Sequence, residues 1–304
     1  MKKTSLLASV TLIASLGLVG CGGGSSSDAP SQGTSNVAVS GTAIDPELKG
    51  ATICLDLNQD GNCTENEPSA KTDGNGNFSL TVSSVQLEGS APLLAIGGID
   101  KESGEAFKGK LFADVNDSFQ NITPLTTLAY EKMKENMGKG QKAVQSGMHD
   151  MEEVIGLTSN EMQANMIAMA NEGNTTTMKV ALSLQKSAEA INPKETIQFY
   201  KNLSPEMNTS KVKNLTNAIL NITPAKLKIR VHSLIKSILD SNVTDPYAMA
   251  NETRTKTEEL GIDQDEMMDE MPNNGDDMPD NGDNMPGNGD NVPGKGNSDM
   301  PARP

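Results

Sequence analysis

The chain has 304 residues and a formal net charge of −15, and its composition includes 3% aromatic residues and no Trp. So few aromatics argue against one large core and favour small modules with polar connections. The acidic balance makes nucleic acid and anionic lipid poor partners, and residues 258–304 alone hold thirteen Asp or Glu against only Lys295 and Arg303.

Residues 1–20 have the plan of a secretory signal peptide, with two lysines followed by a short apolar stretch. The stretch ends in the letters LVGC, and this ending resembles the lipobox of bacterial lipoproteins. The resemblance implies cleavage before Cys21, a lipid on its thiol and attachment to a membrane through that lipid. Gly22 after the cysteine then implies the outer membrane of a bacterial cell envelope. A plain signal peptide or an N-terminal membrane helix is the alternative, although the run is short for a span.

The next two segments are predicted to be a tether and a β domain. Residues 21–35 are rich in Gly and Ser and predict a flexible tether. Between residues 36 and 123, short apolar runs separated by Gly, Asp and Asn predict a small antiparallel β-sandwich. The expected strands are 37–44, 50–57, 76–82, 91–99 and 107–115. In the second of them, apolar residues alternate with Thr52, Cys54 and Asp56, so one face is apolar and the other carries the cysteine and the first acid.

The order of motifs in this β region resembles a known family. The motifs VSGTAID, LKGATICLDLNQDG, NEP and TDGNGNFSL follow one another between residues 37 and 123. They resemble the carboxypeptidase-regulatory-like and SdrD B-like modules of bacterial surface proteins. That resemblance implies a transthyretin-like β-sandwich that serves as a stalk, spacer or binding platform and has no catalytic residues of its own.

Two cysteines remain once Cys21 carries a lipid. In an oxidising compartment Cys54 and Cys63 are expected to form a disulfide. The bond would close a loop of about ten residues, for which chain entropy predicts a stabilisation of about 2.7 kcal/mol. Two free buried thiols are the alternative.

The same loop fits the calcium-binding pattern D-x-[DN]-x-[DN]-G-x5-E over residues 56–67. Its oxygen-bearing residues and the turn glycine predict a weak Ca²⁺ site, in the range of about 10⁻⁴ to 10⁻³ M that extracellular modules show. The expected ligands are Asp56, Asn58, Asp60, the carbonyl of Asn62, Thr64 through a water, and Glu67. The alternative is a surface hairpin in which Asp and Asn bind their own backbone, and the preceding strand, Cys63 and Pro68 support it.

From residue 124 to 261 the apolar period becomes helical. Thr123 is the expected N-cap of a helix that starts at Pro124. Gly and Pro breakers predict five or six short helices in a loose bundle. The clearest helix is expected over residues 223–240, with Thr223 as cap and Pro224 in its first turn.

Thr158 and Glu161 form a predicted capping box ahead of three methionines. Met162, Met166 and Met169 have the spacing of a helical core stripe. The alternative is a Cu(I) site, since thioethers suit that ion.

Residues 262–304 contain repeated units with Pro and Gly and predict a disordered acidic tail. The chain is therefore expected to be α+β: a small antiparallel β-sandwich, then a bundle of short helices, then the tail. His149 and His232 are the only histidines, and no nucleophile motif accompanies them, so no enzyme is predicted. The expected role is a non-enzymatic binding or structural module whose partner is an envelope protein or polysaccharide. The alternatives are an accessory part of an envelope enzyme and a Met-based metal-handling protein.

Overall fold

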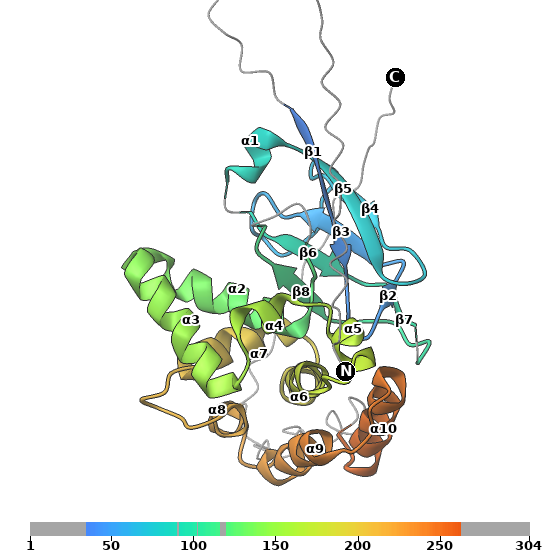
Figure 1. Ribbon diagram of the computed structural model, residues 1–304, viewed down its shortest axis with the longest axis vertical. Coiled ribbons are helices and arrows are strands. Elements are labelled where there is room, and N and C mark those ends of the chain that lie inside the picture. Colours follow the sequence, from blue (N-terminus) through green and yellow to red (C-terminus); the bar gives the residue numbers. More distant parts are fainter. Residues whose placement is uncertain (1–34, 90, 102, 116–119, 263–304) are drawn as a thin grey trace, which may run out of the picture.

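The computed structural model describes residues 35–89, 91–101, 103–115 and 120–262. The predicted signal peptide, Cys21, the tether up to residue 34 and the acidic tail from residue 263 lie outside them. Within the described part the chain is α+β, with small antiparallel sheets first and helices after them (Figure 1). No helix in this part is long and apolar enough to cross a membrane.

The described strands form three small antiparallel sheets. β1 pairs with β5, β2 pairs with β7, and one four-stranded sheet has the order β4-β3-β6-β8. The longer strands lie at the predicted runs. The run 91–99 is split between β6 and the start of β7, and β2 and β4 were not predicted, because two or three residues show no alternation. The bounds are β1 Asn36–Thr42, β2 Leu48–Lys49, β3 Thr52–Leu55, β4 Ser69–Lys71, β5 Asn77–Ser83, β6 Leu93–Ile96, β7 Ile99–Asp100 and β8 Lys110–Ala113.

The four-stranded sheet is buried on both faces. On one face Ile53 and Leu111 share an apolar core with Val39 and Leu80 of the β1–β5 pair. On the other face a row of side chains packs against the helices; it runs from Cys54 through its partner Leu94 to Phe112. Alternation therefore separated the two faces of the strand correctly, but it did not show that the helical half covers the second face.

β1 is held along both of its edges. One edge pairs with β5 over the whole strand. On the other edge, the backbone amide of Gln120 donates to the Ser40 carbonyl at 2.8 Å, and the amide of Ile122 donates to the Thr42 carbonyl at 2.9 Å. A Cβ at Gly41 would lie 1.8 Å from the Gln120 carbonyl oxygen, so only glycine allows this close approach.

Helices make up the rest of the described chain. α1 is a single short helix inside the β region, and the others follow the last strand (Figure 1). The described helices outnumber the five or six that were predicted, because side-chain N-caps such as Asn165 and Asn214 begin helices at points that no Gly or Pro marks. The bounds are α1 Ser84–Leu87, α2 Pro124–Asn136, α3 Gln141–Ile155, α4 Ser159–Gln163, α5 Met166–Asn171, α6 Thr176–Ile191, α7 Thr196–Leu203, α8 Leu215–Ile222, α9 Lys228–Asp240 and α10 Pro246–Glu259, with 3-10 turns at Met137–Lys139 and Ser204–Glu206.

The helix starts test three sequence predictions. The start at Pro124 is confirmed, because the Thr123 hydroxyl accepts the Thr126 amide. The capping box of Thr158 is confirmed at the start of α4. The start at Pro224 was wrong: α9 begins only at Lys228, and the hydroxyl of the preceding Thr223 donates back to the Ile219 carbonyl at 2.7 Å.

α6 is the central helix of the second half. It packs against α2, α5, α7, α9 and α10, which surround it in Figure 1. α2 joins this bundle to the sheet: the Thr126 hydroxyl donates to the Phe112 carbonyl at 2.8 Å, and the Thr127 hydroxyl accepts the Phe112 amide at 2.9 Å. These bonds occupy the outer edge of β8, the last strand of its sheet.

Candidate functional site

The calcium-type loop joins β3 to the short edge strand β4. At its base the Leu55 amide donates to the Pro68 carbonyl at 3.1 Å, and the predicted disulfide is present between Cys54 and Cys63, whose Cα atoms are 5.7 Å apart. Cys54 is fully buried in the core that the sheet shares with the helices. The loop is thus fixed between two strands with no flanking helix, and one end of its disulfide lies in the protein core.

Asp56 organises the turn from a buried position. Its side chain is 1% exposed, and its two carboxylate oxygens accept the amides of Asp60 at 3.2 Å and Gly61 at 3.0 Å. Burial raises the pKa of this carboxyl, and the two amide bonds partly oppose the shift. Gly61 has a φ of +74°, the left-handed conformation that the pattern reserves for glycine.

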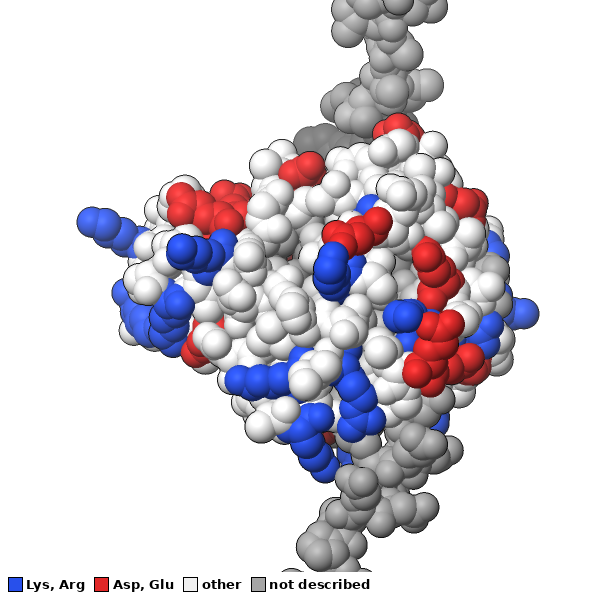
Figure 2. Space-filling view, turned by 90° about the horizontal axis from the view of Figure 1, so that it is seen from below, with Lys and Arg blue, Asp and Glu red and all other residues white. Residues whose placement is uncertain are grey.

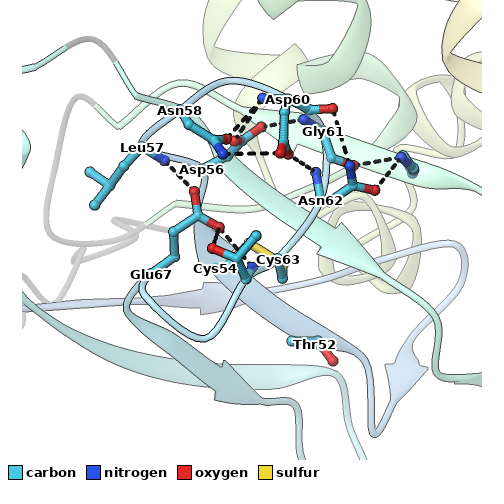
Figure 3. Close-up of a disulfide and its surroundings, with 12 residues drawn as sticks. Thr52, Cys54, Asp56, Leu57, Asn58, Asp60, Gly61, Asn62, Cys63 and Glu67 are labelled. Carbon is cyan, nitrogen blue, oxygen red and sulfur yellow. Dashed lines mark hydrogen bonds between the residues drawn. A yellow bond between two sulfur atoms is a disulfide. The ribbon is translucent and has the colours of Figure 1, made fainter.

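Asn58 and Asp60 lie beside Asp56 (Figure 3). The Asn58 side-chain oxygen accepts the Asp60 amide at 3.0 Å, and its nitrogen donates to the Asp60 carboxylate at 3.0 Å. Asp60 in turn accepts the Asn62 amide at 2.7 Å. Three of the predicted ligands are therefore together, and each also makes the turn-stabilising bonds that the hairpin alternative predicts.

Glu67 points away from this group. One of its oxygens accepts the Leu57 amide at 2.8 Å, and the other accepts the Thr64 amide at 2.9 Å and the Thr64 hydroxyl at 3.2 Å (Figure 3). Glu67 thus closes the loop onto itself. Within the described residues, no three His, Cys, Asp or Glu side chains are grouped as metal ligands would be.

Lys110 of β8 is a neighbour that the sequence did not reveal. Its ammonium group lies 2.5 Å from the Gly61 carbonyl and 3.3 Å from the side-chain oxygen of Asn62. A fixed cation here weakens the attraction of the loop for a second one. The oxygens of Asp56, Asn58 and Asp60 suit Ca²⁺ in type, so the donor set fits a weak site rather than a tight one.

A small cavity of about 80 Å³ separates the loop from the helices and is lined by the loop, β8, α2 and α7. At its floor Phe112 stacks on Tyr130 with the ring centroids 5.5 Å apart. Burial raises the pKa of the Tyr130 hydroxyl to about 12 and also raises the pKa of Glu131 beside it.

The three methionines that were candidates for a Cu(I) site lie in or beside the helical core. Met162 and Met166 are each 1% exposed in the helical core, and Met169 is half-buried. They do not share one helix, because α4 ends at Gln163 and Asn165 caps α5. Met162 and Met166 are thus core residues, as their spacing predicted, but two helices rather than one carry the three methionines.

Both histidines lie outside this core. His149 is exposed and lies 3.1 Å from Glu153, one helical turn further along α3. His232 is exposed on α9. Their positions give no grouping of acid, base and nucleophile.

Comparison of the chain with models of protein families, with curated proteins and with solved structures gives no match.

Proposed function

We propose that the chain is a lipid-anchored, non-enzymatic module of the bacterial cell envelope in which a calcium-type loop braces the joint between a β-sandwich and a helical bundle. The single observation behind the calcium role is the closed loop itself. Asp56, Asn58 and Asp60 present their oxygens together, and the disulfide from Cys54 to Cys63 ties this loop to the protein core.

The disulfide also supports export. Disulfides persist in oxidising compartments, and a signal peptide that ends in a lipobox cysteine would deliver the chain to one. Cys21 would then carry the lipid, residues 22–35 would be the tether, and Gly22 favours the outer membrane. The partner is an envelope protein or a polysaccharide, and the acidic charge of the chain disfavours nucleic acid.

Calcium is tested by calorimetric titration of the oxidised mature chain without its lipid. We expect saturable binding with a dissociation constant of about 10⁻⁴ to 10⁻³ M. Asp60→Ala should abolish it, because this carboxylate lies at the centre of the oxygen group and has no substitute there.

Asp73→Ala is the matched control. Asp73 organises another turn in the same way, accepting the Asn75 amide at 2.8 Å and the Asn77 amide at 2.9 Å, but it lies outside the pattern. Equal binding by the parent and Asp60→Ala, or no binding by the parent, would remove calcium from the proposal.

The anchor is tested separately in the bacterial cell. Cys21→Ser should move the protein from the membrane fraction to the soluble fraction, because the thiol that takes the lipid is gone. A variant that stays in the membrane would show that another segment holds the chain there.

A further inference from the structure

A cleft between the β half and the helices plays no part in the proposed function. Its volume is about 500 Å³, within the range of about 300 to 1,000 Å³ that small-molecule sites occupy. The walls come from the turn after β1, the segment between β7 and β8, and helices α6, α7 and α10. Of the described side chains that line it, five are acids and three are bases.

Asp45 is the unusual member of this lining. It lies in the turn between β1 and β2 and is 7% exposed, so it is more than nine-tenths buried. Its carboxylate is buried and lies near other charged groups, but it accepts no hydrogen bond from the described residues. A buried carboxylate without a donor is costly, and a cavity beside it is where a donor would be expected.

The charges around Asp45 do not balance. Lys186 is the nearby cation, but its ammonium group is 2.8 Å from Glu189 on the same helix. Asp45 and Glu189 therefore share one lysine. Burial, followed by the repulsion from Glu189, raises the pKa of Asp45 well above its usual value.

The rest of the cleft offers an apolar wall and a charged mouth. The Phe107 ring is 9% exposed and lies at the wall together with Pro193. The cleft is bordered by an ion pair on α10, in which the Arg254 guanidinium lies 3.9 Å from the Glu258 carboxylate. In Figure 2, acidic side chains with a few basic ones among them gather on the side of the face where α10 lies.

We propose that this cleft binds a small organic cation, whose ammonium or guanidinium group donates hydrogen bonds to Asp45 and whose apolar body lies against Phe107. The cation supplies a hydrogen-bond donor, which Asp45 lacks among the described residues, and a positive charge beside Asp45, since Lys186 already pairs with Glu189. A metal ion fits less well, since no three Asp, Glu, His or Cys side chains of the described residues are arranged to hold one. The inference does not depend on calcium in the loop.

The test uses the mature chain with agmatine and n-butylamine as probes and 1-butanol as the uncharged probe, all with a calcium chelator present. We expect saturable calorimetric binding of both amines and at least tenfold weaker binding of the alcohol. No binding of either amine would overturn the proposal. Equal binding of amine and alcohol would also overturn it, because the acids would then contribute nothing.

Asp45→Asn keeps the shape of the side chain and removes its charge. It should weaken agmatine binding at least tenfold, whereas unchanged affinity would overturn the assignment to Asp45. Glu131→Gln is the matched control, because Glu131 is also 7% exposed but lines the small cavity at the loop rather than the cleft. Asp60→Ala should keep full agmatine affinity, which separates this site from the calcium loop.

Discussion

The contact between sheet and helices contains two hollows, the small cavity at the loop and the larger cleft, and the start of α7 lies between them. Glu195 and Ile197 face the cavity at the loop, whereas Thr196 faces the cleft. At the loop end, Phe112 stacks on Tyr130 and the disulfide closes the structure. At the cleft end, the Asp45 carboxylate has no hydrogen-bond donor among the described residues, and five acids stand against three bases. The difference teaches that one end of the joint is built for stability and the other for binding.

The largest effect is expected at the loop end, from Phe112→Ala. This side chain is 6% exposed and stacks on Tyr130, so its removal leaves a void between sheet and helix. The free energy of unfolding should fall by about 3 to 5 kcal/mol, measured by urea denaturation. Phe112→Leu is the control and should lose less than half as much. Equal losses would show that the ring itself is unimportant.

The second effect comes from the disulfide. The double variant Cys54→Ala and Cys63→Ala should be less stable by about 2.7 kcal/mol, because its unfolded chain is no longer constrained by a closed loop. The measurement is urea denaturation with and without a reducing agent. The reducing agent should destabilise the parent and leave the double variant unchanged. A parent that is insensitive to reduction would contradict the expectation.

The third effect is at the cleft end, where Tyr247 on α10 donates its hydroxyl to Glu47 at 2.6 Å across 200 positions of sequence. Tyr247→Phe should cost about 1 to 3 kcal/mol, because Glu47 is buried and its other oxygen has no partner within the described part of the chain. The phenyl ring keeps the contact with Lys101, whose ammonium group is 5.6 Å from the ring centroid. If Tyr247→Phe no longer lowers stability in a chain that already carries Glu47→Gln, the hydrogen bond between Tyr247 and Glu47 causes the loss. An equal loss in that background would assign the effect to packing.

An effect of opposite sign is expected from Asp45→Asn. The pKa of Asp45 is raised in the folded state above its usual value of 3.8, so the folded chain keeps this proton to higher pH than the unfolded chain does. Stability from this group is present below about pH 3.8 and is lost as the pH rises toward the folded-state pKa. The variant should therefore match the parent in acid and exceed its free energy of unfolding as the pH rises. Parallel curves of unfolding free energy against pH would refute this.

The two ends also differ in how far sequence predicts them. The loop is local: the residues from Asp56 to Glu67 bond mainly to one another, so a pattern twelve residues long contains the turn, its glycine and the disulfide partner. Its interpretation stayed open, because the same Asp and Asn oxygens serve a metal site and a self-bonded turn. The start of α2 is equally local and was predicted correctly.

The cleft could not be predicted, because its parts come from separate segments. Asp45, Lys186 and Arg254 meet only after the β half docks on α6 and α10. The burial of Cys54 has the same origin: alternation correctly separated the two faces of β3, but nothing local showed that helices cover the second one. Lys110 also meets the loop only through the pairing of β8 with β6.

The double attachment of β1 has a mechanical consequence. The described chain enters the fold at Asn36, and β1 is bonded on one side to β5 and on the other to Gln120 and Ile122. These hydrogen bonds lie across the strand, so a pull along β1 loads many of them together in shear instead of opening them one after another. Tension that arrives through the N-terminal segment would therefore meet the fold at a point suited to resist it.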